Sequence, residues 1–228
     1  TGGNATFTVT LSEVSAQNVT VDYASSDVST TAGSDYTSST GTVTILAGNT
    51  TQTFNVPVLV DTLDEVNETS TLTLSNPTNA TISDATGTLT IVDDDATPSL
   101  SINDVSYTES GTGGNATFTV TLSEVSAQEV TVNYASSNNT ATAGSDYTAA
   151  SGTVTIAAGA TSATFNVGVF ADTLDEASET ATMTLSSPTN ATISDATGTL
   201  TIVDDDTAPT LSINDVSYTE SGTGGNAT

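Results

Sequence analysis

The stretch TLTIVDDDATPSLSIND, residues 88–104, joins two β-strand patterns through three consecutive aspartates and a short linker. It returns as TLTIVDDDTAPTLSIND at residues 199–215, and the same 111-residue offset relates Phe7 to Phe118 without a gap. A fixed period of this length indicates tandem domains, because about 110 residues are enough for one hydrophobic core. The first six and last six residues are the same, TGGNAT, so we expect the 228 residues to be a slice of a longer array.

Apolar residues alternate with threonine within each period, which predicts strands with one buried face. We expect seven strands in the complete unit, at residues 100–107, 116–123, 130–136, 152–156, 163–170, 180–186 and 198–203. The phase breaks between Ile102 and Val105, which predicts a bulge at Asn103 and Asp104. The residues expected to point inward are Leu100, Ile102, Phe118, Val120, Leu122, Val130, Val132, Tyr134, Val154, Ile156, Phe165, Val167, Val169, Met183, Leu185, Leu200 and Ile202.

Short strands separated by Gly, Asn and Ser turns are typical of an antiparallel β-sandwich. The sequence therefore predicts an all-β chain of tandem seven-stranded antiparallel β-sandwiches with a 111-residue repeat. Residues 1–98 would form a repeat that lacks its first strand, and residues 99–209 a complete repeat with its linker. Residues 210–228 would be the first strand and the following loop of a further repeat.

The composition excludes several classes of partner. The chain has 27 acidic residues and no Lys, Arg, His or Cys. Binding to nucleic acid or to an anionic membrane surface requires basic residues. Without Cys the chain has neither disulfides nor thiolate metal ligands. Acidic, aromatic-poor chains are often disordered, but the regular alternation argues against disorder here.

The acids are not spread evenly along the repeat. If successive strands run up and down, nine of the thirteen acids in residues 99–206 fall on the loops at one end of the sandwich. We call this the acidic end. Its members are Glu109, Asp146, Asp172, Asp175, Glu176, Glu179, Asp204, Asp205 and Asp206.

Crowded carboxylates repel one another. Two unit charges about 6 Å apart cost roughly 2.8 kcal/mol at an effective dielectric near 20. No basic side chain is available, so protons or cations have to compensate. Oxygen ligands on flexible loops favour Ca²⁺, with Mg²⁺ as the second choice, whereas zinc and copper prefer His or Cys. Alternatively, the aspartate triplet is a solvated charge run, and Asp146 only stabilises its own turn.

Several motifs of the complete repeat, in this order, resemble the Calx-β domain. They are SYTESG (106–111), TAGSDYT (142–148), SGTVTIAAGATSATFNV (151–167), ADTLDEASETATMTLSSPTNA (171–191) and GTLTIVDDD (198–206). This domain occurs in the regulatory regions of sodium–calcium exchangers and in many bacterial surface proteins, and the likeness covers essentially the whole chain.

The resemblance implies a seven-stranded sandwich with Ca²⁺ at one end. In the complete repeat it implies the ligands Glu109, Asp146, Asp172, Asp175, Glu176, Asp204, Asp205 and Asp206. In the first repeat the counterparts are Asp35, Asp61, Asp64, Glu65, Asp93, Asp94 and Asp95, and the trailing strand carries Glu220.

We expect a non-catalytic, calcium-stiffened repeat of an extracellular fibre, matrix or adhesin stalk at the cell surface. Its partners would be calcium ions and neighbouring repeats or copies of itself, with no small-molecule substrate. The closest alternative is a filament in which the trailing strand completes the next subunit's open sandwich. An intracellular calcium sensor is a further alternative. Outward threonines would also suit ice binding, and sequons such as Asn115 would allow glycosylation.

Overall fold

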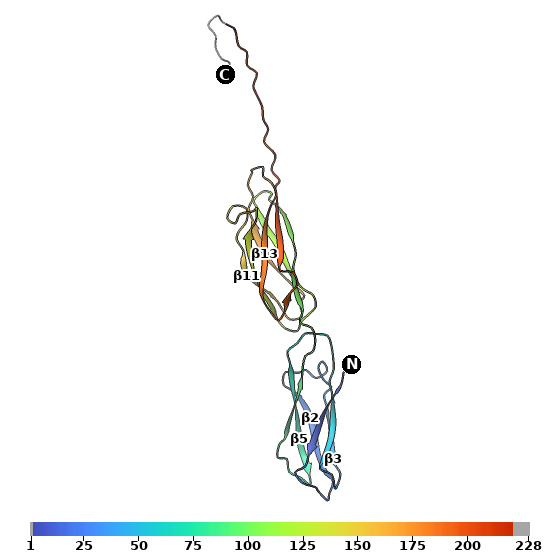
Figure 1. Cartoon of the computed structure of the whole chain (residues 1–228). Helices are drawn as coiled ribbons and strands as arrows, with labels where there is room; N and C mark the ends of the chain where they lie inside the picture. The colour runs from blue at the N-terminus through green and yellow to red at the C-terminus, as the bar shows by residue number, and fades with distance from the viewer. Residues whose placement is uncertain (1, 221–228) are drawn as a thin grey trace.

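Alternating apolar and threonine residues form β-strands in both repeats, because successive side chains of a strand point to opposite faces. The computed structural model describes residues 2–220 (Figure 1). The first repeat contains β1 (Asn4–Thr10), β2 (Val19–Asp27), β3 (Thr40–Ile45), β4 (Thr51–Pro57), β5 (Glu68–Thr78) and β6 (Thr86–Ile91). The second contains β7 (Ser99–Ile102), β8 (Val105–Thr108), β9 (Gly114–Leu122), β10 (Val130–Asn138), β11 (Ser151–Ile156), β12 (Ser162–Val169), β13 (Glu179–Thr189), β14 (Thr192–Ile193) and β15 (Thr197–Val203).

The second repeat is a sandwich of two sheets. One sheet has the strand order β11-β10-β13-β15-β8, and the other has the order β12-β9-β7-β14. In the first repeat the matching sheets are β3-β2-β5-β6 and β1-β4. The predicted all-β tandem sandwich is therefore confirmed. Two strand pairs, β15 with β8 and β14 with β7, run parallel, which departs from a fully antiparallel arrangement.

The predicted bulge at Asn103 and Asp104 is the point where the first strand of the repeat changes sheets. Ile102 pairs with Val120 of β9, whereas Val105 pairs with Leu200 of β15. The two polar side chains satisfy the backbone on either side of the change. The Asn103 Oδ1 accepts the N–H of Thr119 at 2.6 Å, and the Asp104 Oδ1 accepts the N–H of Thr199 at 2.7 Å.

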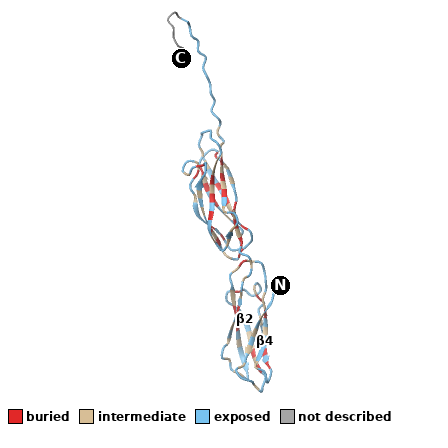
Figure 2. Ribbon diagram, viewed as in Figure 1, coloured by how far each residue is buried: buried red, intermediate tan, exposed pale blue. Residues whose placement is uncertain are grey.

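The predicted inward residues form the core of the second repeat. All of them are buried except Tyr134, which packs against the core half-buried. Phe165 stacks between Phe118 and Tyr134, with ring centroids 5.4 and 3.9 Å away. In the first repeat the buried residues fall into two separate clusters, and Figure 2 shows fewer of them there. The described residues of that repeat contain no counterpart of β7 and β8 to close the sandwich.

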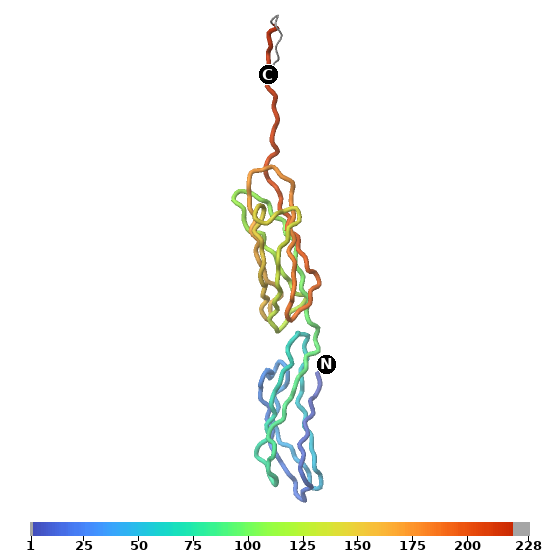
Figure 3. Tube along the Cα trace, turned by 60° about the vertical axis from the view of Figure 1, so that its left-hand side comes forward, coloured from blue at the N-terminus to red at the C-terminus, as the bar shows by residue number. Residues whose placement is uncertain are grey.

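The two repeats lie end to end, and the trailing segment continues in the same direction (Figures 1 and 3). Residues 207–220 of this segment have no regular secondary structure. The expected boundaries at residues 98 and 209 stay predictions, and residues 221–228 of the expected third unit lie outside the described range. Within residues 2–220, no helix has the length and hydropathy needed to cross a membrane.

Leu100 and Leu211 occupy the same position in the repeat in different surroundings, since Leu100 is 0% exposed and Leu211 is 101% exposed. We expect Leu100→Ala to destabilise the second repeat by about 2–5 kcal/mol, because it removes a buried side chain and leaves a cavity. Leu211→Ala should leave the unfolding midpoint in urea unchanged. A clear loss of stability from Leu211→Ala would contradict this and show that the trailing segment packs into a sandwich.

Candidate metal centre

The turn that carries Asp146 is fixed by a buried tyrosine. Tyr147 is fully buried, and its hydroxyl donates to the Asn138 Oδ1 at 2.7 Å. Gly144 adopts a φ of +94°, which a residue with a Cβ rarely does, and this lets the chain fold back. The Asp146 Oδ2 accepts the N–H of Thr142 at 2.6 Å. Asp146 therefore stabilises its own turn, as one alternative predicted, and its carboxylate also faces Glu179.

The same turn in the first repeat positions Asp35. Tyr36 is 1% exposed and donates to the Asp27 Oδ1 at 2.7 Å, and the Asp35 Oδ2 accepts the N–H of Thr31. The backbone carbonyl of Asp35 accepts the N–H of Leu59, just beyond the end of β4, at 2.9 Å. The turn is thereby tied to the chain that leads into the next acidic loop.

Carboxylates from three parts of the first repeat converge at the acidic end. One oxygen each of Asp35, Glu65 and Glu68 lies within 4.8 Å of the others. Glu68 is the first residue of β5, and Glu65 is in the loop before it. A depression beside this cluster is lined by Val60, Asp61, Glu65, Val66, Glu68, Ile91, Val92, Asp93, Asp94 and Asp95.

Like charges and burial make these carboxylates hard to ionise. Burial, followed by the neighbouring Asp35, Glu65 and Asp61, raises the pKa of Glu68 to about 7. The pKa of Glu65 is raised for the same reasons. A bound cation would remove this penalty, because an opposite charge favours the ionised form.

The acidic end of the second repeat centres on Glu109, which is 7% exposed. Its N–H donates to the carbonyl of Val203 at 3.0 Å, which holds it beside the end of β15. Burial, followed by the charges of Asp172, Asp204, Glu176 and Asp206, raises the pKa of Glu109 to about 7. Burial and nearby acids also raise the pKa values of Glu176, Glu179 and Asp206.

Two carboxylate oxygens at this end have no hydrogen-bond partner although they are buried. They are the Oδ1 of Asp204 and the Oδ2 of Asp206. Buried polar atoms are normally hydrogen-bonded, so such oxygens need an explanation. A cation coordinated by oxygen ligands satisfies both them and the surrounding charge, and the residues of this end therefore fit a hard divalent cation.

The structure brings most of the predicted ligands together. The predicted ligands that lie at or beside the cluster of the first repeat are Asp35, Asp61, Glu65, Asp93, Asp94 and Asp95. At the acidic end of the second repeat, the charges of Asp172, Glu176, Asp204 and Asp206 act on Glu109, and that of Asp146 acts on Glu176. Asp175 and Asp205 are exposed, and their negative charges help to raise the pKa of Asp206. Glu220 is exposed on the trailing segment.

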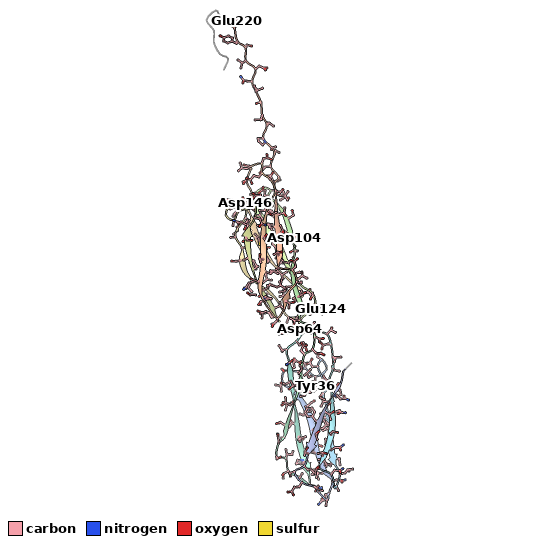
Figure 4. The ribbon with its side chains drawn as sticks, viewed as in Figure 1. Tyr36, Asp64, Asp104, Glu124, Asp146 and Glu220 are labelled. Carbon is pink, nitrogen blue, oxygen red and sulfur yellow. The ribbon has the colours of Figure 1, made fainter. Side chains whose placement is uncertain are left out.

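Asp64, another predicted ligand, contacts the second repeat through its carboxylate. The Asp64 Oδ2 accepts the hydroxyl of Ser126 at 2.7 Å and the side-chain N–H of Gln128 at 3.3 Å. Figure 4 shows Asp64 at the junction and Asp146 near the opposite end of the second repeat.

The predicted ligand set omitted Glu68 and its counterpart Glu179. The signal was present, since each follows the Asp-Glu pair of its loop by three residues and starts a strand. A strand's first residue has a fixed direction, which a loop residue lacks.

The family of the chain follows from its sequence. A family model for the Calx-β domain matches residues 1–95 and again residues 93–206. The chain belongs to the Calx-β family. Calx-β domains are calcium-binding domains that occur in tandem. A search of curated proteins finds no match to this chain.

Solved structures of CALX domains are similar to this chain at low identity. The crystal structure of CBD12 from CALX1.2 is 22% identical, with 82% of this chain and 74% of that chain covered and a TM-score of 0.40. The calcium binding domain CBD12 of CALX1.1 is 20% identical, covering 82% and 73%, with a TM-score of 0.41. The apo form of the Calx CBD1 domain is 19% identical, covering 49% and 100%, with a TM-score of 0.42.

The raised pKa values of Glu68 and Glu109 predict how stability depends on pH without metal. Between about 4.5, the ordinary value of a glutamate, and about 7, the folded chain binds protons that the unfolded chain does not. Stability in a chelator should therefore rise as the pH falls from 8 to 5.

Thermal unfolding across this pH range tests the prediction. In chelator, the unfolding midpoint of the parent should rise as the pH falls from 8 to 5. This rise should be smaller in the double variant Glu68→Gln, Glu109→Gln, and smaller for the parent in excess Ca²⁺. A midpoint that falls steadily on acidification from pH 8 to 5 in chelator would contradict it.

Proposed function

We propose that this chain is part of a calcium-stiffened structural array, in which the acidic end of each Calx-β repeat binds Ca²⁺. The observation that carries the proposal is the pair of buried, unpartnered oxygens on Asp204 and Asp206. They lie among like charges in a chain that has no basic side chain. No side chain of the protein has the opposite charge needed to compensate them.

The ligands favour Ca²⁺ over other ions. Carboxylate oxygens suit hard cations, and Ca²⁺ accepts six to eight of them at about 2.3–2.6 Å in irregular geometry. The ligands of one cluster come from a turn, a loop and the start of a strand, and an irregular arrangement of this kind suits Ca²⁺ better than the stricter octahedron of Mg²⁺. Asp35, Glu65 and Glu68 would hold the ion in the first repeat.

Bound calcium would stiffen the chain because the acidic end of the first repeat faces the second. The linker leaves β6 through Asp93, whose N–H donates to the Asn67 Oδ1 at 3.0 Å. It reaches β7 through Pro98, which is buried and restricts the backbone. An ion shared by the loop before β5 and the aspartates of the linker would fix the direction in which the second repeat leaves.

An extracellular setting suits this chemistry. Extracellular modules typically bind Ca²⁺ with dissociation constants near 10⁻⁴–10⁻³ M. At 100 times such a constant, one ion adds about 2.7 kcal/mol to the stability of the folded state. We therefore propose a fibre or adhesin stalk at a cell surface, made of end-to-end repeats like the two in Figure 1.

Assembly by strand exchange is a second candidate, favoured by the exposure of the trailing segment. Leu211 and Ile213 are 101% and 94% exposed, whereas Leu100 and Ile102 at the same repeat positions are buried. The first repeat has a groove along β1 and β6, lined by Phe7, Thr8, Val9, Thr10, Phe54, Leu72, Leu74, Ser83, Asp84, Thr86 and Gly87. In the second repeat, the Gly87 counterpart Gly198 is covered by Asn103 and Ile102. A trailing segment from another copy would fit the groove in the same way.

Glu179→Gln tests whether the glutamate that starts β13 is a calcium ligand. We expect it to weaken Ca²⁺ binding to the second repeat by at least roughly 10–100-fold, which is the loss of metal affinity when a residue hydrogen-bonded to a ligand is removed. Glu129→Gln, an exposed acid outside the acidic end, is the matched control and should change nothing. Isothermal titration calorimetry measures both. Equal affinities for the two variants would contradict the assignment, and micromolar affinity in the parent would favour a sensor.

Small-angle X-ray scattering tests the stiffening itself. The chain should have a longer maximum dimension and a narrower distribution of shapes in Ca²⁺ than in chelator, because unscreened carboxylates at the junction repel one another and loosen it. Mg²⁺ at the same ionic strength is the control. An equally extended chain in chelator would show that calcium is not what stiffens it.

A further inference from the structure

The contact between the two repeats is made by a buried carboxylate. Asp64 is 5% exposed and Ser126 is 1% exposed. Besides the bonds to the Asp64 carboxylate from Ser126 and Gln128, the Asp64 carbonyl accepts the N–H of Ala127 at 3.0 Å. Hydrogen bonds to an ionised acceptor are stronger than neutral ones, and a buried carboxylate requires them. This set of bonds is therefore a specific junction rather than an incidental touch.

The turn at residues 126–128 makes the same internal hydrogen bond as its counterpart in the first repeat, on which no repeat is docked. At the junction, the Ser126 Oγ also accepts the N–H of Gln128 at 3.0 Å. The first repeat carries the same sequence, EVSAQ, at residues 13–17. There the Ser15 Oγ accepts the N–H of Gln17 at 3.0 Å, although no repeat is docked on it. The turn is thus formed in advance, so docking requires little reordering.

The aspartate side of the contact is also repeated. The loops of both repeats contain TLDE and begin with the same turn. The N–H of Leu63 donates to the Asp61 Oδ1 at 2.9 Å, and that of Leu174 donates to the Asp172 Oδ1 at 2.7 Å. In the second repeat Asp175 is exposed, and Leu174 beside it is 62% exposed.

We propose that Asp64 and residues 126–128 are the two halves of a repeat-to-repeat joint, and that their copies at the outer ends of the chain bind further repeats of the same sequence. Asp175 would dock on the EVSAQ turn of a following repeat, and residues 15–17 would receive the aspartate of a preceding one. The partner is a repeat of this sequence because both halves are identical in the two repeats. A different protein would have to reproduce the hydroxyl, the amide and the backbone N–H in one turn.

One consequence rests on the calcium site proposed above. Glu65 belongs to the carboxylate cluster and directly follows Asp64, so the two neighbours face different partners. A cation that holds Glu65 would also hold Asp64 toward the second repeat. Calcium would then strengthen the joint through one loop, without touching the second repeat.

Distances between the repeats test the joint, and the absence of cysteine makes labelling simple. Spin labels on Thr44→Cys and Thr155→Cys, both exposed strand positions, report the distance distribution by pulsed electron resonance. In saturating Ca²⁺, Asp64→Ala and Ser126→Ala should each broaden the distribution at least about twofold. The matched variants Asp175→Ala and Ser15→Ala should leave it unchanged.

The outcomes separate the joint from the calcium proposal. The proposed joint would be overturned if all four variants kept the distance distribution of the parent. It would also be overturned if Asp64→Ala and Asp175→Ala broadened that distribution equally. If Asp64→Ala broadens the distribution while chelator leaves the parent narrow, the joint stands and the calcium coupling fails.

The outer halves are tested by adding unlabelled chain to ¹⁵N-labelled chain at millimolar concentration. Amide signals of residues 15–17 should shift with parent chain and should not shift with Asp175→Ala chain. No shift with the parent, or equal shifts with both, would overturn the proposed docking of further repeats.

Discussion

The structure depends on one electrostatic constraint: carboxylates are gathered at one end of each sandwich, and no side chain of opposite charge is available to offset them. The strands themselves carry few acids, because threonine fills their outward positions. The acids are instead mostly on loops, and in each repeat a buried tyrosine, Tyr36 or Tyr147, holds one of these loops, the turn that carries Asp35 or Asp146, in place from the core. The cost of the gathering is visible in Glu68 and Glu109, whose pKa values rise to about 7. A fold that keeps so unfavourable an arrangement in both repeats points to a use for it, and cation binding is the use that removes the cost.

The alternation of apolar residues was enough to predict the strands and the core. Phe118, Val120 and Leu200 are fully buried as expected, because the side-chain period of a strand leaves one choice of face once a core exists. The break at Asn103 and Asp104 was also readable, although the pattern could not tell a bulge from a change of sheet. Which sheet a strand joins depends on pairing with residues about 95 positions away, such as Thr199 with Asp104.

The site was predictable as a region and less so residue by residue. Strand parity places whole loops at one end, but it does not say which carboxylate of a loop points to the cluster. Glu68 was missed, although it begins a strand, because the ligands that the resemblance implied for this loop end at Glu65. The resemblance implied Asp64 as a ligand, and its contact with Ser126 and Gln128, which lie 62 and 64 residues away in another repeat, was not foreseen. No local pattern reports a contact of that kind. The loop before β5 has two faces, with Glu65 toward the cluster and Asp64 toward the next repeat, and only the structure separates them.

The central claim is that divalent ions neutralise the acidic ends, and locating the ions tests it most directly. A crystal of the chain grown in calcium, measured at a wavelength where calcium scatters anomalously, shows where they lie. The account predicts anomalous peaks among Asp35, Glu65 and Glu68 and among Glu109, Asp204 and Asp206. Density free of peaks at both acidic ends, at calcium concentrations well above 1 mM, would contradict it.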